Sequence, residues 1–293
     1  MAWLAGYTYR KKITITGQSG AGTNYQVKFL IGKASGATGE HFDLEGHCLD
    51  TMLDMRFTDN DETTQIDYWI ESVAASGTSY LATVWIEVRD TLESNADIYI
   101  YYGKAGDTDG SSGANTFLQY HGAASTPFKD SAICPPNNVA FEVKFKRTAN
   151  GHPTDGYGNC GVGFVNADIS DYIRFQNYNF DNTRGFYTGN EGTSTRITET
   201  PNLTLDVYYR LLFTSISTVV RGYVDGDEIA AGSTTNLPDE DLGLEMWVAH
   251  DTVTCLQDFS FARKFVATEP AYSSAGVEET ESAVNTTNFF LMF

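Results

Sequence analysis

Hydrophobic and polar residues alternate one by one along many stretches of this chain. In the stretch VAFEVKFKR, the side chains of Val139, Phe141, Val143 and Phe145 alternate with mostly charged ones. The same alternation recurs in residues 7–15, 66–71 and 84–89, and the stretch DIYIYYG closes this first set. Successive side chains of a β-strand point to opposite faces, so this pattern predicts strands with one buried face. No stretch shows a comparable helical period.

The predicted strands fall into two sets. Residues 103–116, rich in Gly, Ser and Asp, separate the sets as a loop or linker. After the strand that begins at Val139, further strands are predicted at residues 160–165, 171–177, 184–188, 205–214, 217–224, 228–231, 243–250 and 255–266. We therefore expect an all-β protein with two β-sandwich domains, residues 1–117 and 118–277. A polar linker with an apolar tail would follow over residues 278–293.

Three carboxylates, Asp225, Asp227 and Glu228, occur close together in the stretch RGYVDGDEIAAG. The Asp-Gly pair favours a type I′ turn, because both central residues of that turn need positive φ angles. Residues 205–231 then form a three-stranded meander. The carboxylates are assigned to its turn and to a strand start, not to a catalytic or metal-binding cluster.

Two stretches of this meander resemble a known fold. VYYRLLFT at 207–214 and YVDG at 223–226 are similar to strands of the concanavalin-like or laminin-G-like jelly roll. The stretch LQDFSFARKFVATEPAYSSAG resembles the end of such domains. The resemblance covers residues 125–277 and implies a concanavalin-like jelly roll for the second domain.

The N-terminal part resembles a different family. The stretches YTYRKKITI, GAGTNYQVKF, LDMRFTDNDETTQIDYWIES, VWIEVRD, IYIYYG and GANTF, within residues 3–117, are similar to an uncharacterised all-β domain. That domain is often found beside concanavalin-like domains in microbial and viral surface proteins. The resemblance implies no catalytic residues.

Charge and cysteine content exclude some classes of partner. The chain has 19 Lys and Arg against 38 Asp and Glu, a net charge of -19, so phosphate backbones would repel it. We expect no nucleic-acid partner. The cysteines Cys48, Cys134, Cys160 and Cys255 lie far apart without a CxxC pair, so zinc is unsupported and disulfide pairing stays open.

The sequence also predicts no membrane span and no classical export. No stretch approaches the roughly 20 apolar residues of a spanning helix. The stretch MAWLAGYTYRKK lacks the basic and apolar regions of a signal peptide.

Glycoside hydrolysis is the activity that a concanavalin-like sandwich suggests first. It needs two carboxyl groups facing the sugar, which glucanases of this fold carry at alternate positions of one strand. Here Asp239, Glu240 and Asp241 precede a predicted strand, and Glu245 lies alone within it. The histidine, serine and cysteine residues form no recognisable catalytic motif. We therefore expect a non-enzymatic protein.

Binding of carbohydrate needs aromatic platforms with amides and carboxylates on neighbouring loops. The stretches GHPTDGYGN and QNYNFDNTRGFY supply such residues. The candidate ligand-binding residues are Tyr157, Asn177, Tyr178, Asp181, Arg184 and Tyr187. The alternative is that they are ordinary residues of hairpins and β surfaces.

The stretch FTDNDET contains the candidate metal ligands Asp59 and Asp61. Their oxygens could suit Ca²⁺, although the longer ligand series of an EF-hand loop is missing. The favoured alternative is an acidic turn. No other cofactor is expected.

The last residues, Phe289, Phe290, Leu291, Met292 and Phe293, are apolar at a terminus, where polar residues are usual. We expect this tail to dock onto a partner subunit, the alternative being that it folds back onto its own domain.

These observations favour a non-enzymatic structural or adhesive protein of a virion surface. We expect it to bind other subunits of that surface and to form a homo-oligomer. Host cell-surface glycan is a further candidate partner. The alternative is a carbohydrate-binding module of a microbial extracellular or cell-surface protein. A glycoside hydrolase is a distant alternative.

Overall fold

The protein consists of two compact units, of which one is built from two separate parts of the chain. The computed structural model describes residues 3–148, 160–177, 184–199, 203–248 and 255–281. Unit 1 combines the chain up to Ser112 with the chain from Pro270 onward, and unit 2 is Gly113–Glu269. Unit 2 is thus inserted into unit 1. Among the described residues, no helix is long and apolar enough to cross a membrane.

Unit 1 contains two sheets. The first, called the β1 sheet, has the strand order β20 (Ala271–Ala275), β1 (Tyr9–Thr16), β7 (Ala96–Tyr102), β4 (Arg56–Thr58), with β21 (Glu279–Thr280) also on β1. The second, called the β2 sheet, has the order β3 (Phe42–Asp43), β2 (Tyr25–Gly32), β6 (Ser79–Val88), β5 (Tyr68–Ser76).

Aromatic contacts show that these two sheets are stacked. Tyr272 of β20 lies 6.4 Å from Phe29 of β2 and 5.7 Å from Phe42 of β3, measured between ring centroids. Toward the other edge, Phe57 of β4 lies 5.0 Å from Tyr68 of β5. Contacts at both edges close an apolar core between the sheets.

Unit 2 also contains two sheets, and each has six strands. The β10 sheet has the order β17 (Asp227–Ser233), β16 (Val219–Val224), β15 (Tyr209–Ile216), β10 (Val139–Arg147), β19 (Cys255–Lys264), β8 (Gln119–His121). The β11 sheet has the order β14 (Thr193–Glu199), β13 (Arg184–Asn190), β12 (Tyr172–Asn177), β11 (Cys160–Val165), β18 (Gly243–Val248), β9 (Phe128–Lys129). A short helix, α1 (Gly113–Thr116), precedes them.

The core of unit 2 lies between these sheets. The alternate apolar residues of β10, from Val139 to Phe145, are buried in it as their spacing predicts. Rings from opposite sheets meet there, with Phe186 and Phe213 4.9 Å apart. The expected class, all-β with two β-sandwiches, is confirmed.

The predicted Asp-Gly turn is also confirmed. Asp225 and Gly226 have φ angles of 51° and 94°, and they join β16 to β17. The Asp225 carboxylate accepts the backbone N–H of Arg210 at 2.8 Å, and Glu228 pairs with Arg221 at 2.7 Å. The three carboxylates of this stretch therefore shape a hairpin.

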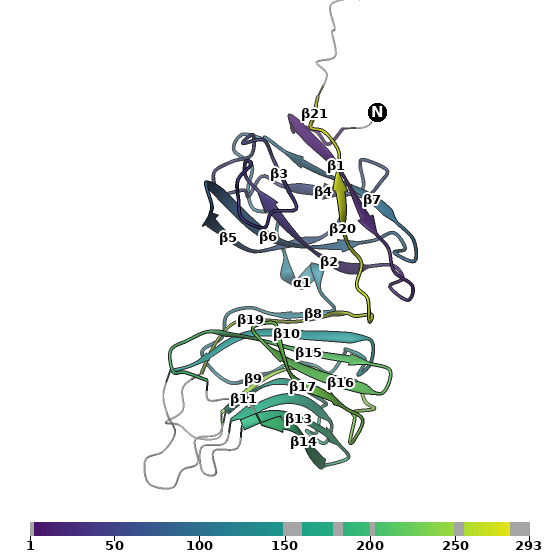
Figure 1. The fold of residues 1–293 in the computed structure, drawn as a ribbon, viewed down its shortest axis with the longest axis vertical. Helices are drawn as coiled ribbons and strands as arrows, with labels where there is room; N and C mark the ends of the chain where they lie inside the picture. Colours follow the sequence, from purple (N-terminus) through teal and green to yellow (C-terminus); the bar gives the residue numbers. More distant parts are fainter. Residues whose placement is uncertain (1–2, 149–159, 178–183, 200–202, 249–254, 282–293) are drawn as a thin grey trace, which may run out of the picture. The chain divides into compact units, whose positions relative to one another are not determined.

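The end of the chain differs from the predicted domain division. Residues 271–277 were assigned to the second domain, but β20 and β21 pair with β1 of unit 1, and Figure 1 shows yellow β20 alongside purple β1. Ion pairs explain this placement. Arg10 of β1, only 1% exposed, binds Glu279 at 2.7 Å and Glu62 at 2.9 Å. The Glu278 carboxylate accepts the Tyr102 hydroxyl at 2.8 Å.

One predicted strand start was wrong. The strand predicted from residue 205 begins at Tyr209, because Asp206 has a φ of 60°, which interrupts extended backbone. Residues 103–112 form the predicted loop, which is held in place because Arg56 donates to the Thr108 carbonyl at 2.6 Å and the Ser111 hydroxyl accepts the N–H of Ile70, whereas Gly113–Thr116 form α1. Strands β2 and β14 were not among the predicted ones.

Candidate functional site

The outer face of the β11 sheet carries one row of paired residues that crosses all six strands. Core residues such as Ile173, Phe175, Leu244 and Met246 fix the inner face, so their neighbours in sequence point outward. The paired outward residues, from edge to edge, are Lys129, Glu245, Gly163, Arg174, Tyr187 and Arg196. Five of the six strands thus place cations, a carboxylate and an aromatic ring in one line, and β11 contributes a glycine.

Arg174 is the centre of this face. Its guanidinium carbon lies 3.9 Å from the Tyr172 ring centroid and 5.5 Å from that of Trp247. Its Nη1 atom lies 3.9 Å from Oε2 of Glu245. The stacking of a planar cation on aromatic rings holds its orientation and leaves an aromatic surface with a fixed positive charge.

Two glycines make room for these side chains. A Cβ atom at Gly163 would lie 2.6 Å from Cβ of Arg174, and one at Gly161 would lie 2.4 Å from Nε1 of Trp247. Both glycines belong to β11, between β12 and β18. Because positions 161 and 163 carry no side chain on the outer face of β11, Arg174 and Trp247 can lie over the middle of the sheet.

Glu245 is buried on this face without a hydrogen-bond donor. Its exposed fraction is 6%, and its Oε2 atom has no hydrogen-bond partner among the described residues. Burial raises the pKa of Glu245, and the positive charges of Arg174 and Lys129 offset only part of that increase. An ionised carboxylate in this position has acceptor capacity to offer to a ligand that donates hydrogen bonds.

The row includes one of the predicted ligand-binding residues. Tyr187 lies on β13, in register with Arg174. Asn177 and Arg184 pair with each other across β12 and β13, but their side chains lie outside the description. Tyr157, Tyr178 and Asp181 lie outside the described residues.

Four members of this face were not among the predicted ligand-binding residues: Tyr172, Arg174, Glu245 and Trp247. The signal was present in the stretches YIRFQN and GLEMWV, where these residues alternate with apolar ones that face the core. Alternation alone does not predict that β11 lies between β12 and β18, which brings these residues together.

The predicted metal ligands form a turn. Asp61 accepts the N–H groups of Thr63 at 2.9 Å and Thr64 at 2.7 Å, and these bonds, with that of the Thr64 hydroxyl, lower its pKa to about 2. Asp59 hydrogen-bonds Asp90, whose pKa is raised by burial and by the charge of Asp59. Within the described part of the chain, no group of three or more metal-ligating side chains occurs.

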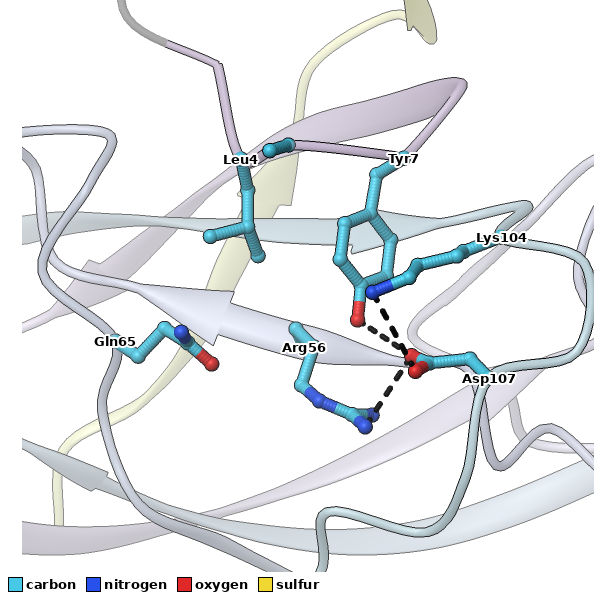
Figure 2. A pocket seen from close by; sticks show the side chains of 7 residues that line it. Leu4, Tyr7, Arg56, Gln65, Lys104 and Asp107 are labelled. Carbon is cyan, nitrogen blue, oxygen red and sulfur yellow. Dashed lines mark hydrogen bonds and ion pairs between the residues drawn. The ribbon is translucent and has the colours of Figure 1, made fainter.

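Unit 1 contains a pocket of about 280 Å³. It is lined by Leu4, Ala5, Tyr7, Arg56, Gln65, Lys104 and Asp107. Figure 2 shows the Asp107 carboxylate as the point on which Tyr7, Arg56 and Lys104 converge. The Tyr7 hydroxyl donates to it at 2.5 Å, and the cations of Arg56 and Lys104 lie 3.2 Å and 3.6 Å away.

The charges of this pocket balance one another internally. Burial alone would raise the pKa of Asp107, but the Tyr7 hydroxyl and the two cations keep it below its usual value. Burial and the bond to Asp107 raise the pKa of Tyr7. An ion-paired carboxylate and a protonated phenol make neither a good base nor a good nucleophile. The network instead fixes the loop after β7 onto unit 1.

Comparisons with known proteins reach part of the chain. Residues 51–132 match a family described as "Domain of unknown function (DUF2341)", which overlaps the N-terminal stretch that resembles an uncharacterised all-β domain. None of the curated proteins matches this sequence.

Several solved structures are similar to about half of the chain. The carbohydrate-binding module CBM66 from Bacillus subtilis is 13% identical with a TM-score of 0.35, covering 49% of this chain and 96% of that one. Galectin LEC-6 from Caenorhabditis elegans is 13% identical with a TM-score of 0.35, covering 52% and 99%. A xylan beta-1,4-xylosidase from Bacillus halodurans is 7% identical with a TM-score of 0.35, covering 48% and 30%. Values this low carry no argument about function, which depends here on the geometry of the site.

Proposed function

We propose that this protein binds carbohydrate on the outer face of the β11 sheet. The observation that carries the proposal is the buried Glu245 carboxylate, which has an oxygen without a hydrogen-bond donor beside Arg174. This oxygen is enclosed in the unbound protein, so a sugar hydroxyl would donate to it after the neighbouring side chains of the face have been displaced. The rings of Tyr172 and Trp247 contact Arg174, and the half-buried Trp247 supplies the apolar surface that sugar C–H groups pack against.

The chemistry of the row favours binding over hydrolysis. Glycoside hydrolases use two carboxyl groups, one as acid and one as base or nucleophile. In this row the neighbours of Glu245 are Arg174 and Lys129, both cations. We therefore propose a binding module without hydrolytic activity, as the sequence predicts.

The ligand class follows from the same charges. Arg174 and Glu245 together form a paired donor and acceptor, which suits the vicinal hydroxyls of a neutral sugar. The net charge of -19 disfavours long polyanionic glycans. A neutral saccharide of a cell surface or cell wall is the expected ligand.

A glycan array followed by calorimetry tests the proposal. In Trp247→Ala, affinity for a neutral glycan should fall roughly tenfold, because stacking area is lost. In Glu245→Gln, it should fall about fivefold to tenfold, because a charged acceptor becomes neutral.

The matched control is Glu228→Gln, which alters a carboxylate of the Asp225 hairpin on the other sheet and should leave affinity unchanged. An array without any saturable ligand would refute carbohydrate binding. A glycan that binds both site variants as tightly as the unchanged protein would place the site elsewhere.

The virion-surface role stays a prediction. It depends on the tail Phe289–Phe293, which lies outside the described residues, and on partner subunits. Attachment of a particle to host glycans would be compatible with the face described above, and so would a microbial extracellular protein.

A further inference from the structure

The four cysteines of this chain are all free and buried, and two of them lie together. Cys160 is the first residue of β11 and Cys255 is the first residue of β19. The two strands belong to opposite sheets of unit 2. Both side chains are part of the core between those sheets, with exposed fractions of 0% and 2%.

Each of the two cysteines begins a strand opposite the last residue of a neighbouring strand, Cys160 opposite Val248 of β18 and Cys255 opposite Arg147 of β10, and both side chains point into that core. A hydrogen bond joins the two side chains, and it raises the pKa of Cys255 together with burial. A disulfide needs the two sulfur atoms about 2.05 Å apart, and thiols that already interact across the core are suitably placed to form one. Cys134, by contrast, makes its hydrogen bond with Gln119.

A buried cation lies beside this pair. Arg147 is opposite Cys255 in the pairing of β10 with β19, and it is 5% exposed. Its Nη2 atom donates to the Leu203 carbonyl at 3.0 Å, while its Nε atom has no hydrogen-bond partner among the described residues. The hydrogen bond to Cys160 and burial raise the pKa of Cys255, and the positive charge of Arg147 offsets only part of that increase, so the folded protein holds this thiol protonated.

We propose that Cys160 and Cys255 form a disulfide that joins the two sheets of unit 2 when the protein folds in an oxidising environment. Glutathione disulfide would be the oxidant. One cysteine thiolate attacks it, which gives a mixed disulfide and one glutathione thiol. The second cysteine thiolate then displaces the other glutathione, so that two protein thiols are oxidised and one glutathione disulfide is reduced to two thiols.

The burial of the two thiols determines when the disulfide can form. In the folded protein both thiols are shielded and burial holds the pKa of Cys255 high, so exchange with glutathione is slow. The bond therefore forms in the folding chain, where the thiols are still accessible, and folding then encloses it.

The bond would also support the proposed ligand face. Cys160 pairs with Val248 and directly precedes Gly161, over which the Trp247 indole lies. A covalent link at Cys160 would anchor this end of β11 to the opposite sheet. The disulfide itself does not depend on whether carbohydrate binds.

The full chain tests this inference. The protein is unfolded, refolded either in a glutathione redox buffer or in dithiothreitol, and its thiols are alkylated before intact-mass and peptide analysis. In the redox buffer, two of the four cysteines should resist alkylation, and one peptide pair should link Cys160 to Cys255. The oxidised form should melt on the order of 5–10 °C higher than the reduced form.

Variants make the assignment specific. Cys48→Ser, in unit 1, should retain the protected pair, whereas Cys160→Ser and Cys255→Ser should each lose it. If either of the latter fails to fold, the peptide map of the unchanged protein still decides. Four alkylated cysteines after oxidative refolding, or a linkage through Cys48 or Cys134, would overturn the proposal.

Discussion

Whether a charged side chain of this protein can be buried depends on the ion-pair and hydrogen-bond partners around it. The alternating pattern places Arg10 and Glu142 on the polar faces of their strands, yet their exposed fractions are only 1% and 5%. Arg10 is buried against Trp3 and Glu279, and Glu142 is bound by Arg263 at 3.2 Å. Paired charges can be buried at modest cost, which explains why position in a pattern predicts face but not exposure.

Glu245 is compensated only in part, by the charges of Arg174 and Lys129, and the stability of unit 2 should therefore depend on pH. Its pKa is raised in the folded state, so the folded protein binds this proton more tightly than the unfolded chain. The resulting stability is fully present below the unfolded pKa and is lost as the pH rises through the folded pKa.

Replacing Glu245 with Gln should therefore stabilise unit 2 at neutral pH by about 1 kcal/mol while it weakens ligand binding. Urea denaturation of both proteins, from mildly acidic to neutral pH, checks this. The difference should shrink toward acidic pH, and Glu228→Gln should show no such trend. A variant less stable than the parent at neutral pH would contradict the assignment of Glu245 as a buried carboxylate that is compensated only in part.

At the level of strands and turns, local chemistry was predictable where it acts through neighbouring residues. The Asp225-Gly226 turn and the inward face of β10 follow from residues adjacent in sequence. The ligand face could not be predicted in this way, because its residues come from β12 and β18 on either side of β11, and those strands come from distant parts of the chain. Alternation identifies which side chains point outward but not which of them meet.

The glycines of β11 give an element-scale prediction. A methyl group at Gly161 would lie 2.4 Å from Nε1 of Trp247 and 2.5 Å from the Phe175 carbonyl oxygen, so the strand or the indole must move. Gly161→Ala should lower the stability of unit 2 by about 1–3 kcal/mol and reduce glycan affinity.

Urea denaturation and calorimetry measure the two effects. Gly122→Ala is the matched control, because its added methyl would have its nearest neighbour at 3.8 Å, an ordinary contact. Unchanged stability in Gly161→Ala would show that β11 is not closely covered by Trp247.

On the scale of the whole molecule, unit 1 depends on a strand that follows unit 2 in the sequence. β20 and β21 pair with β1, and Glu278 and Glu279 bind side chains of that sheet. The domain division predicted from sequence did not assign β20 and β21 to unit 1, because the sequence of a strand does not indicate which distant strand it pairs with.

Truncation tests this dependence. A chain that ends at Glu269 should retain folded unit 2 but lose about 3–5 kcal/mol from unit 1, since buried Arg10 is left without Glu279. Hydrogen exchange followed by mass spectrometry resolves the two units. A chain that ends at Glu281 is the control and should exchange like the full protein. Equal protection of β1 in both truncated chains would contradict the anchoring role of β20 and β21.

The return of β20 to β1 also fixes an order of events on the ribosome. As the chain emerges, every strand of unit 2 becomes available before the last strand of unit 1 has been translated. The edge of β1 that β20 covers therefore stays unpaired while unit 2 is being translated. During that interval the open edge of β1 can pair with strands of other nascent chains. A chaperone that covers this edge should therefore raise the yield of folded unit 1 more than that of unit 2.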